Sequence, residues 1–124
     1  MFLPENDYQI LRLTDLFYQD YPHSRYGEIM IKKNRAYNCL LFQTHYDYFI
    51  CIPYRTEIVH DNAYRFKYSK RSEKHRSGLD YSKIIIITET KYLDNKDAII
   101  DKDEFKETIR NIEKIKYQIF FNYP

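Results

Sequence analysis

The stretch from Ile50 to His60 carries the residues best suited to chemistry. A short apolar run reaches Pro53, where the backbone must stop donating hydrogen bonds to a sheet, and Arg55, Thr56 and His60 follow. Arginine offers a planar fork of donors that fits phosphate, threonine offers a hydroxyl, and histidine titrates near neutrality. A strand end of this kind holds reactive side chains rigidly, and a solvated turn is the alternative interpretation.

The segment 62–83 concentrates positive charge. It holds seven lysines and arginines against two acidic residues, a local net charge of +5, whereas the whole chain has a net charge of +2. Cations for phosphates beside aromatic rings for bases are typical of a surface that faces RNA, and a solvated loop beside an aromatic strand is the alternative. The interleaved rings are Tyr64, Phe66, Tyr68 and Tyr81. The residues predicted to contact RNA are Arg65, Lys67, Lys70, Arg71, Lys74, Arg76 and Ser82 here, and Tyr26, Lys32 and Lys33 in the basic segment 22–35.

Size and composition predict one domain. A chain of 124 residues is long enough for a single core without disulfides or metals. Cys39 and Cys51 each lie in an apolar run and are interpreted as buried, reduced thiols. The four histidines are too widely spaced for a recognised metal pattern, so we expect neither a metal nor another cofactor. No apolar run has the length of a membrane span and no signal-peptide pattern begins the chain, so we expect a cytoplasmic protein without a membrane partner.

The first half of the chain predicts a strand, a short helix and a hairpin. Residues 8–13 form the strand, and the helix runs from Thr14 as its N-cap to about residue 20, with Leu16 and Phe17 on its inner side. Pro22 ends this helix, and a loop with a short strand at 29–31 follows. Two nearly continuous apolar runs, 37–43 and 48–52 around a turn at 44–47, predict a central, buried hairpin.

The second half predicts two more strands and a long helix. Alternation over 64–68 indicates a strand with one wet face, and the four isoleucines of 83–87 indicate a buried strand. Between them, the polar segment 69–77 is expected to be a mobile loop closed by Gly78. Asp101 caps a helix from about residue 103 to 121. We predict an α+β fold: a small, curled, mostly antiparallel sheet of about five strands with N- and C-terminal helices packed on it.

Apolar residues recur at helical spacing along the last predicted helix and should pack on the sheet, while the opposite face should be solvated. The apolar stripe is Phe105, Ile109, Ile112, Ile115 and Ile119, and the solvated face is Lys106, Glu107, Arg110, Glu113 and Lys114.

Three motifs occur in an order that resembles a known family. They are Arg-Ala-Tyr-Asn at 35–38, Ile-Pro-Tyr-Arg-Thr at 52–56 with His60, and Ser-Gly-Leu-Asp-Tyr-Ser-Lys at 77–83 before the isoleucine run. Together they resemble the endoribonuclease toxins of type III toxin–antitoxin systems, the ToxN/AbiQ group, and most of all its CptN and TenpN branches. The resemblance covers roughly residues 8–90. Tyr54 stands where these branches usually have leucine, and the chain ends at Pro124, before the C-terminal RNA-contacting helices of longer members.

The resemblance implies a fold, a reaction and partners. The fold would be a curled, barrel-like sheet similar to that of the Kid/MazF toxins. The reaction would be metal-independent cleavage of cellular mRNA to a 2′,3′-cyclic phosphate. The inhibitor would be a small RNA antitoxin, a pseudoknot derived from tandem repeats, which the toxin itself cuts into units and with which it forms an RNA-bridged oligomer. Such systems imply a role in phage defence.

By the same resemblance, Arg35 takes the place of a basic active-site residue, and Arg55 and Thr56 take the places of the polar pair after the proline. Attack by the 2′-hydroxyl of RNA requires its deprotonation, stabilisation of charge on the phosphorane and protonation of the leaving 5′-oxygen. We assign the two arginines to the phosphate charge, and Thr56 to a phosphate oxygen or the 2′-hydroxyl. His60 is the candidate acid or base, with Lys83 as the next choice. A structural histidine in a turn is the alternative for His60.

Two other functions remain open from the sequence. One is a Kid/MazF-type toxin that cleaves mRNA and is inhibited by a protein. The other is a non-catalytic RNA-binding barrel that uses the 62–83 surface.

Overall fold

Strands dominate the part of the chain that the structure describes. This structure, a computed structural model, describes residues 8–22, 38–44, 47–97 and 100–121. The strands are β1 (Tyr8–Leu13), β2 (Asn38–Gln43), β3 (Phe49–Arg55), β4 (Ala63–Arg65), β5 (Gly78–Asp80), β6 (Ile85–Ile87) and β7 (Leu93–Asp97). The helices are α1 (Asp15–Asp20), α2 (Lys102–Arg110) and α3 (Ile112–Phe121), with 3₁₀ turns η1 (Arg71–Glu73), η2 (Tyr81–Lys83) and η3 (Thr90–Tyr92).

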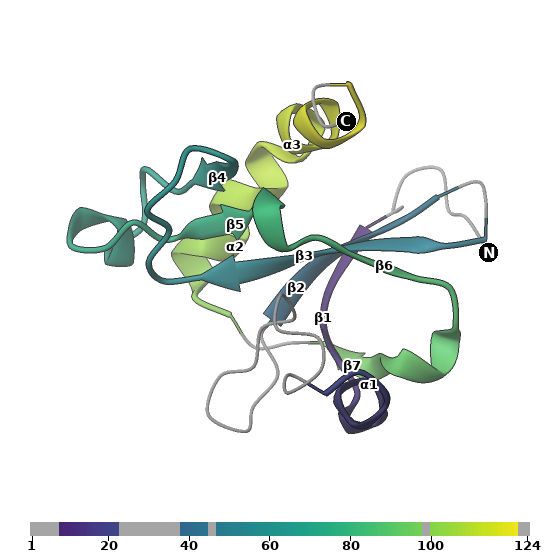
Figure 1. Cartoon of the computed structure of the whole chain (residues 1–124). Coiled ribbons are helices and arrows are strands. Elements are labelled where there is room, and N and C mark those ends of the chain that lie inside the picture. The colour runs from purple at the N-terminus through teal and green to yellow at the C-terminus, as the bar shows by residue number, and fades with distance from the viewer. Residues whose placement is uncertain (1–7, 23–37, 45–46, 98–99, 122–124) are drawn as a thin grey trace.

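The sheet is antiparallel and is built around the predicted hairpin of β2 and β3 (Figure 1). Its order is β4-β5-β3-β2-β1-β7, and β6 pairs with β3. The predicted α+β class and antiparallel sheet are therefore confirmed, with seven strands rather than about five. The barrel is not confirmed, because β4 and β7 end the strand order and no ladder joins them among the described residues.

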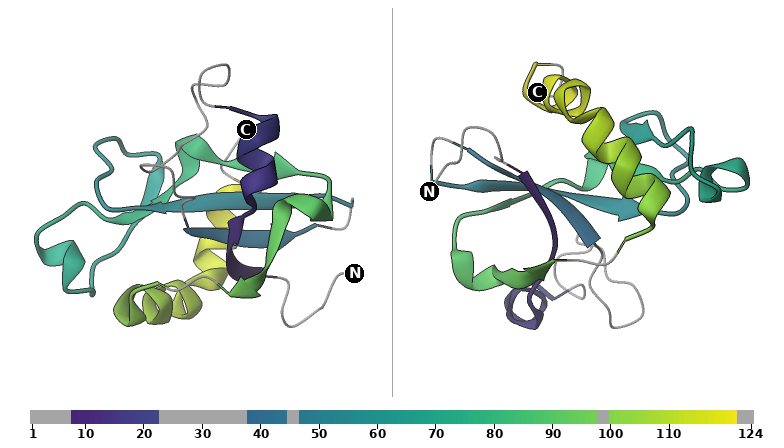
Figure 2. Two further views of the ribbon diagram at one scale, coloured as in Figure 1. Left: turned by 90° about the horizontal axis from the view of Figure 1, so that it is seen from below. Right: turned by 180° about the vertical axis from the view of Figure 1, so that it is seen from behind.

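Both faces of the central strands are covered. Leu40 and Ile52 belong to one core with α3, whereas Leu41 and Cys51 belong to a second core with Phe17 of α1. The helices α1 and α3 lie on opposite sides of the sheet in Figure 1 and in the right-hand view of Figure 2. Alternate residues of β2 and β3 therefore face two apolar layers, which explains why these strands are apolar at nearly every position.

Both cysteines are buried free thiols in the second core, as predicted. Burial raises the pKa of Cys39 to about 12, so this thiol stays protonated at neutral pH. None of the helices in the described ranges is both long and apolar enough to cross a membrane.

Pro53 does not end its strand. On one side β3 pairs with β2, in register up to Cys39 opposite Pro53. On its other side β3 pairs with β6 up to Cys51 and with β5 from Tyr54 onward. The proline lies where the neighbouring strand changes, so its missing N–H interrupts little pairing and the strand continues to Arg55.

Two apolar predictions were wrong. Ile86 in the isoleucine run is 54% exposed, whereas Ile87 is buried. Among the described strands β6 pairs with β3 alone, and side chains alternate, so only one face of β6 reaches the second core. Leu16 is also exposed, and Phe17 is the one residue of α1 that is buried.

The last predicted helix is two helices. Asp101 caps α2 as expected, since its side chain accepts the backbone N–H groups of Asp103 and Glu104. Asn111 leaves the helical conformation between α2 and α3. The predicted stripe is right for α3, where Ile115 and Ile119 are buried and Ile112 packs partly against them. It is wrong for α2, whose buried residues are Glu104, Glu107 and Thr108 while Phe105 is exposed.

The polar inner face of α2 has a physical cause. It packs on the polar ends of tyrosines and on free backbone amides instead of an apolar surface. The Tyr54 hydroxyl hydrogen-bonds Thr108 at 2.9 Å, and the Tyr64 hydroxyl donates to Glu107 at 3.0 Å. The Glu107 carboxylate also accepts the backbone N–H groups of Lys67 at 2.9 Å and Tyr68 at 3.0 Å. These amides turn to a carboxylate instead of a neighbouring strand, so β4 stops at Arg65 rather than reaching Tyr68 as predicted.

We predict that Glu107→Gln destabilises the fold. An amide in place of the buried carboxylate lacks the negative charge that strengthens these hydrogen bonds. Its NH₂ group would also face the Tyr64 hydroxyl or the backbone N–H groups, which are themselves donors. Hydrogen bonds to charged groups contribute about 1.5–3 kcal/mol, and a loss of that size in the free energy of unfolding is expected in urea denaturation. Glu113→Gln on α3 is the matched control, because its side chain is 87% exposed and should change little. Equal stability of the two variants would contradict the role of Glu107.

Candidate functional site

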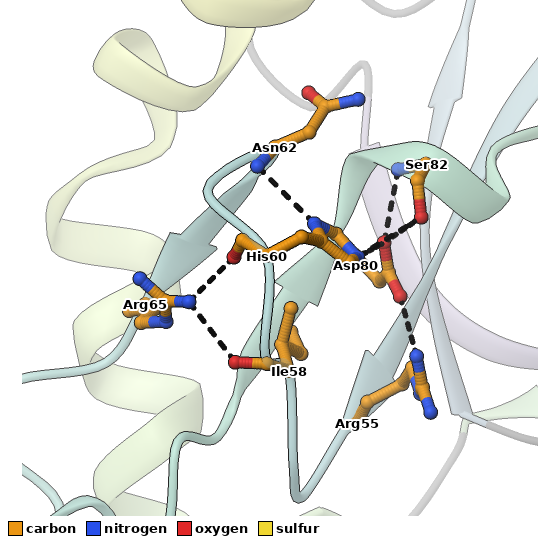
Figure 3. A network of polar contacts seen from close by, with 7 residues as sticks. All are labelled: Arg55, Ile58, His60, Asn62, Arg65, Asp80 and Ser82. Atoms are coloured by element: carbon orange, nitrogen blue, oxygen red, sulfur yellow. Dashed lines mark hydrogen bonds and ion pairs between the residues drawn. The ribbon is translucent and has the colours of Figure 1, made fainter.

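The buried carboxylate of Asp80 brings together three residues, Arg55, His60 and Ser82 (Figure 3). It accepts a hydrogen bond from Arg55 Nη1 at 2.8 Å, one from the Ser82 hydroxyl at 2.6 Å and one from the Ser82 backbone N–H at 2.9 Å. His60 Nε2 lies 3.1 Å from the same carboxylate and 3.1 Å from the Ser82 hydroxyl. We call Arg55, His60, Asp80 and Ser82 the Asp80 cluster.

The sheet brings these residues together from distant positions. Arg55 ends β3 directly opposite Gly78, the first residue of β5, and Asp80 ends β5 opposite Ala63 of β4. A side chain at Gly78 would place its Cβ 2.1 Å from the backbone oxygen of Tyr64, so only glycine lets β5 approach β4 this closely. Asp80 is then in position to cap the turn η2 through the backbone N–H of Ser82.

The electrostatics keep Asp80 charged. Burial favours the neutral acid, but hydrogen bonds from Ser82 and Arg55 and the nearby His60 outweigh it, and the pKa of Asp80 lies below its ordinary value. The Asp80 side chain is completely buried, whereas those of Arg55 and His60 are 31% and 37% exposed. The guanidinium of Arg55 and the imidazole of His60 are therefore partly exposed to solvent, and both are held by the buried, charged carboxylate of Asp80.

The tautomer of His60 follows from its neighbours. The backbone N–H of Asn62 donates to Nδ1 at 3.2 Å, so Nδ1 is the acceptor and Nε2 carries the hydrogen in neutral His60. Nε2–H then faces Asp80 and Ser82, and the Ser82 hydroxyl is directed at Asp80. A serine nucleophile needs a histidine that accepts its proton, so this geometry does not favour acyl transfer.

Arg65, predicted to contact RNA, braces the loop that holds His60. Its Nη2 donates to the backbone oxygens of Ile58, at 3.0 Å, and His60 (Figure 3). Its Nη1 lies 3.5 Å from the exposed carboxylate of Asp61. The two bonds from Nη2 hold the backbone of Ile58 and His60 in place beside β4.

Thr56 lies apart from the Asp80 cluster although it follows Arg55 directly. It lines a shallow hollow of about 550 Å³ together with the turn η1. The strand β3 ends at Arg55 and the chain bends at Thr56, and the residues that line the hollow with Thr56 do not include Arg55. We call this the basic hollow; its lining residues are Thr56, Lys70, Arg71, Glu73, Lys74 and His75.

The cations of the basic hollow have different partners. Arg71 lies 3.7 Å from Glu104, and His75 hydrogen-bonds Glu57. Burial raises the pKa of Glu104, and the guanidinium of Arg71 offsets part of this effect. Lys70 and Lys74 are exposed and form no ion pair within the described residues, so they are the cations best placed to meet a ligand.

The remaining predicted site residues contribute less to this arrangement. Lys67 and Arg76 are exposed and Lys83 is half-buried, and no hydrogen bond or ion pair among the described residues joins their side chains to the Asp80 cluster. The segment 69–77 is a loop, as predicted, with buried serines at both ends and η1 between them. The predicted residues Arg35, Tyr26, Lys32 and Lys33 lie outside the described residues.

Asp80 is the functional candidate that sequence reasoning missed. Its signal was the Asp-Tyr-Ser step at 80–82, an acid two residues before a serine, which is a turn-capping pattern. In the described part of the chain, no three side chains of histidine, cysteine, aspartate or glutamate come together as metal ligands.

We predict that Asp80→Asn destabilises the protein in a pH-dependent manner. The pKa of Asp80 is lower in the folded than in the unfolded protein, so the charged carboxylate stabilises the fold above the unfolded pKa of about 3.9. This stabilisation is lost as the pH falls through the folded pKa. Urea denaturation should show a deficit at pH 7 that shrinks below about pH 4. Asp61→Asn, at a fully exposed carboxylate, is the control and should follow the wild type. A deficit that stays constant with pH would contradict the charged Asp80.

Comparison of the chain with protein-family models, curated proteins and solved structures found no match, so the geometry and the motifs carry the functional argument.

Proposed function

We propose that this chain is an endoribonuclease toxin that cuts RNA by attack of the 2′-hydroxyl and leaves a 2′,3′-cyclic phosphate. The supporting observation is the Asp80 cluster, in which a buried carboxylate holds Arg55 and His60 side by side at the surface. This reaction needs a group that stabilises the negative charge on the phosphate, which a guanidinium can do, and a group that accepts the 2′-hydroxyl proton, which an imidazole can do. Neither group requires a metal.

The proposed step moves two protons and exchanges one bond. The 2′-oxygen forms a bond to phosphorus while the bond from phosphorus to the 5′-oxygen breaks. Arg55 binds the phosphate oxygens and stabilises the added charge. His60 takes the 2′-hydroxyl proton at Nδ1, releasing the long hydrogen bond from Asn62, and Asp80 stabilises the imidazolium from the Nε2 side. Lys83, at the end of η2, is the second titratable candidate and would protonate the 5′-oxygen.

The basic hollow supports a positioning role for Thr56. Since Thr56 lines it with Lys70 and Lys74, we assign Thr56 to a neighbouring phosphate rather than to the one being cut. The scissile phosphate would then lie at the Asp80 cluster, and the strand would continue across the basic hollow.

The partners follow from the resemblance of the three motifs. We propose that a small, repeat-derived RNA inhibits the toxin and is cut by it, and that cellular mRNA is the target. An upstream tandem-repeat RNA gene would support this inhibitor, and an upstream reading frame for a protein antitoxin would support a Kid/MazF-type system.

A non-catalytic RNA-binding protein is the second candidate. One observation favours it: both ring nitrogens of His60 are engaged, Nδ1 with the Asn62 amide and Nε2 with Asp80. A structural histidine has the same contacts. Activity of the purified protein on RNA separates the two functions.

We predict cleavage of single-stranded RNA in excess chelator, with 2′,3′-cyclic phosphate ends. A substrate with a 2′-deoxy sugar at the cut position should resist, because it lacks the attacking oxygen. Gel analysis of end-labelled RNA measures both results. Efficient cutting of the deoxy substrate, or activity that returns only with a divalent ion, would contradict the mechanism.

In the same assay, Arg55→Lys should slow cleavage about 10²- to 10³-fold, the usual cost of one lost donor to the developing charge. This variant keeps a positive charge beside the buried Asp80 and removes the planar guanidinium. It therefore tests the hydrogen-bond donors of Arg55 without leaving the carboxylate unpaired. Arg12→Lys, on the exposed face of β1, is the control. Wild-type rates for Arg55→Lys would place the site elsewhere.

We predict that Lys70→Gln with Lys74→Gln weakens RNA binding and flattens its salt dependence. For single-stranded RNA the slope of log affinity against log salt should fall by up to roughly 0.7 for each contact removed. Arg71 is left in place because Glu104 depends on it. Lys102→Gln with Lys106→Gln on α2 is the control. Equal slopes for both double variants, measured by fluorescence anisotropy, would remove the basic hollow from the RNA path.

A further inference from the structure

Tyr68 is the one tyrosine or phenylalanine of the 62–83 segment that the fold leaves at the surface. Tyr64, Phe66 and Tyr81 are buried at 6%, 5% and 5% exposure and belong to the core with α3. Tyr68 is 75% exposed. A ring with this exposure offers a free aromatic face on which a ligand can pack.

The backbone around Tyr68 is held firmly. Its own N–H donates to the buried carboxylate of Glu107 at 3.0 Å. The next residue, Ser69, is 1% exposed and is tied to Ser72 by two hydrogen bonds, of 3.0 and 2.6 Å. The ring is therefore carried on an anchored segment, and little conformational entropy is lost when a ligand packs on it.

Tyr68 is also close in the chain to the basic hollow, which Lys70 lines. Only Ser69 separates Tyr68 from Lys70, so their Cα atoms are at most about 7.6 Å apart. Phosphates and bases alternate along a nucleic acid strand, and a cationic hollow beside an exposed ring matches that alternation.

We infer that Tyr68 and the basic hollow form a nucleotide subsite, in which an unpaired base of the RNA stacks on Tyr68 and its phosphate lies against Lys70 and Lys74. The ligand class is single-stranded nucleic acid, because bases in a duplex are stacked on one another and do not present a free face. The subsite rests on the proposed function for its role as a substrate clamp, but its binding can be measured without cleavage.

The experiment measures binding of a short 2′-O-methyl oligoribonucleotide, which lacks the attacking hydroxyl and cannot be cut by the proposed reaction. Tyr68→Leu should lose about 5- to 150-fold in affinity, the range measured for one base–aromatic stack, while Tyr68→Phe should bind like the wild type. Tyr117→Leu is the matched control, since Tyr117 is 57% exposed on α3. In a series of probes, each with one abasic position, one probe should lack the base that stacks on Tyr68. That probe should bind the wild type and Tyr68→Leu with equal affinity.

Cleavage gives a second readout. If the ring binds and does not react, Tyr68→Leu should raise KM for single-stranded RNA and leave kcat unchanged. A fall in kcat with unchanged KM would overturn the subsite.

Other outcomes also decide the matter. Unchanged affinity in Tyr68→Leu, an equal loss in Tyr117→Leu, or an equal loss towards a duplex of the same sequence would each overturn it. So would a loss of self-association in Tyr68→Leu with unchanged oligonucleotide affinity, which would make the ring a protein contact. Binding that depends on Tyr68 in a protein that never cuts RNA would refute the nuclease function and keep the subsite.

Discussion

The candidate site depends on one constraint: the charged carboxylate of Asp80 is completely buried and needs hydrogen-bond partners. Removing a carboxylate from water is costly unless its oxygens are fully hydrogen-bonded. Asp80 meets this condition by drawing Arg55 from the end of β3, His60 from the following loop and Ser82 from η2. The three segments are thereby locked together, and the two partly exposed members are held in one orientation. A group that must be satisfied for stability thus also orients the groups available for chemistry.

The same principle recurs in α2. This helix packs its polar face inward, where Glu107 accepts hydrogen bonds from the Tyr64 hydroxyl and from two backbone amides. Those amides begin the loop that carries the basic hollow, so a buried carboxylate also supports that surface. The nearby Glu104 has a raised pKa because burial disfavours its charge, and Arg71 stabilises the charged form in part. Two acids of one helix therefore hold a basic loop, one by hydrogen bonds to its backbone and the other by a charge contact.

The Asp80 cluster and the basic hollow are adjacent in the chain, because the consecutive residues Arg55 and Thr56 belong to one each. Arg55 turns to the Asp80 cluster and Thr56 to the basic hollow, so a strand of RNA that reached both would have to pass the end of β3. In the proposed function, the Asp80 cluster would stabilise the charge on one phosphate and the basic hollow would position the neighbouring phosphates. The order of these features along the chain is also the order of the motifs that resemble the type III toxins.

The sequence by itself determined the β1 strand, the α1 helix, the β2–β3 hairpin and the cap at Asp101, because each depends on local periodicity or on capping within a few residues. It also singled out Arg55 and His60, since their positions after an apolar strand are visible without a fold. Only the tertiary structure decided that they meet at Asp80, that Thr56 faces away from them, and that Arg65 braces a loop. It likewise decided that Glu107 is buried and Phe105 exposed, against the helical periodicity. Periodicity records which residues share a face, but what that face meets depends on strand pairing between distant segments. Here the face of α2 met tyrosine hydroxyls and backbone amides, which Thr108 and Glu107 satisfy.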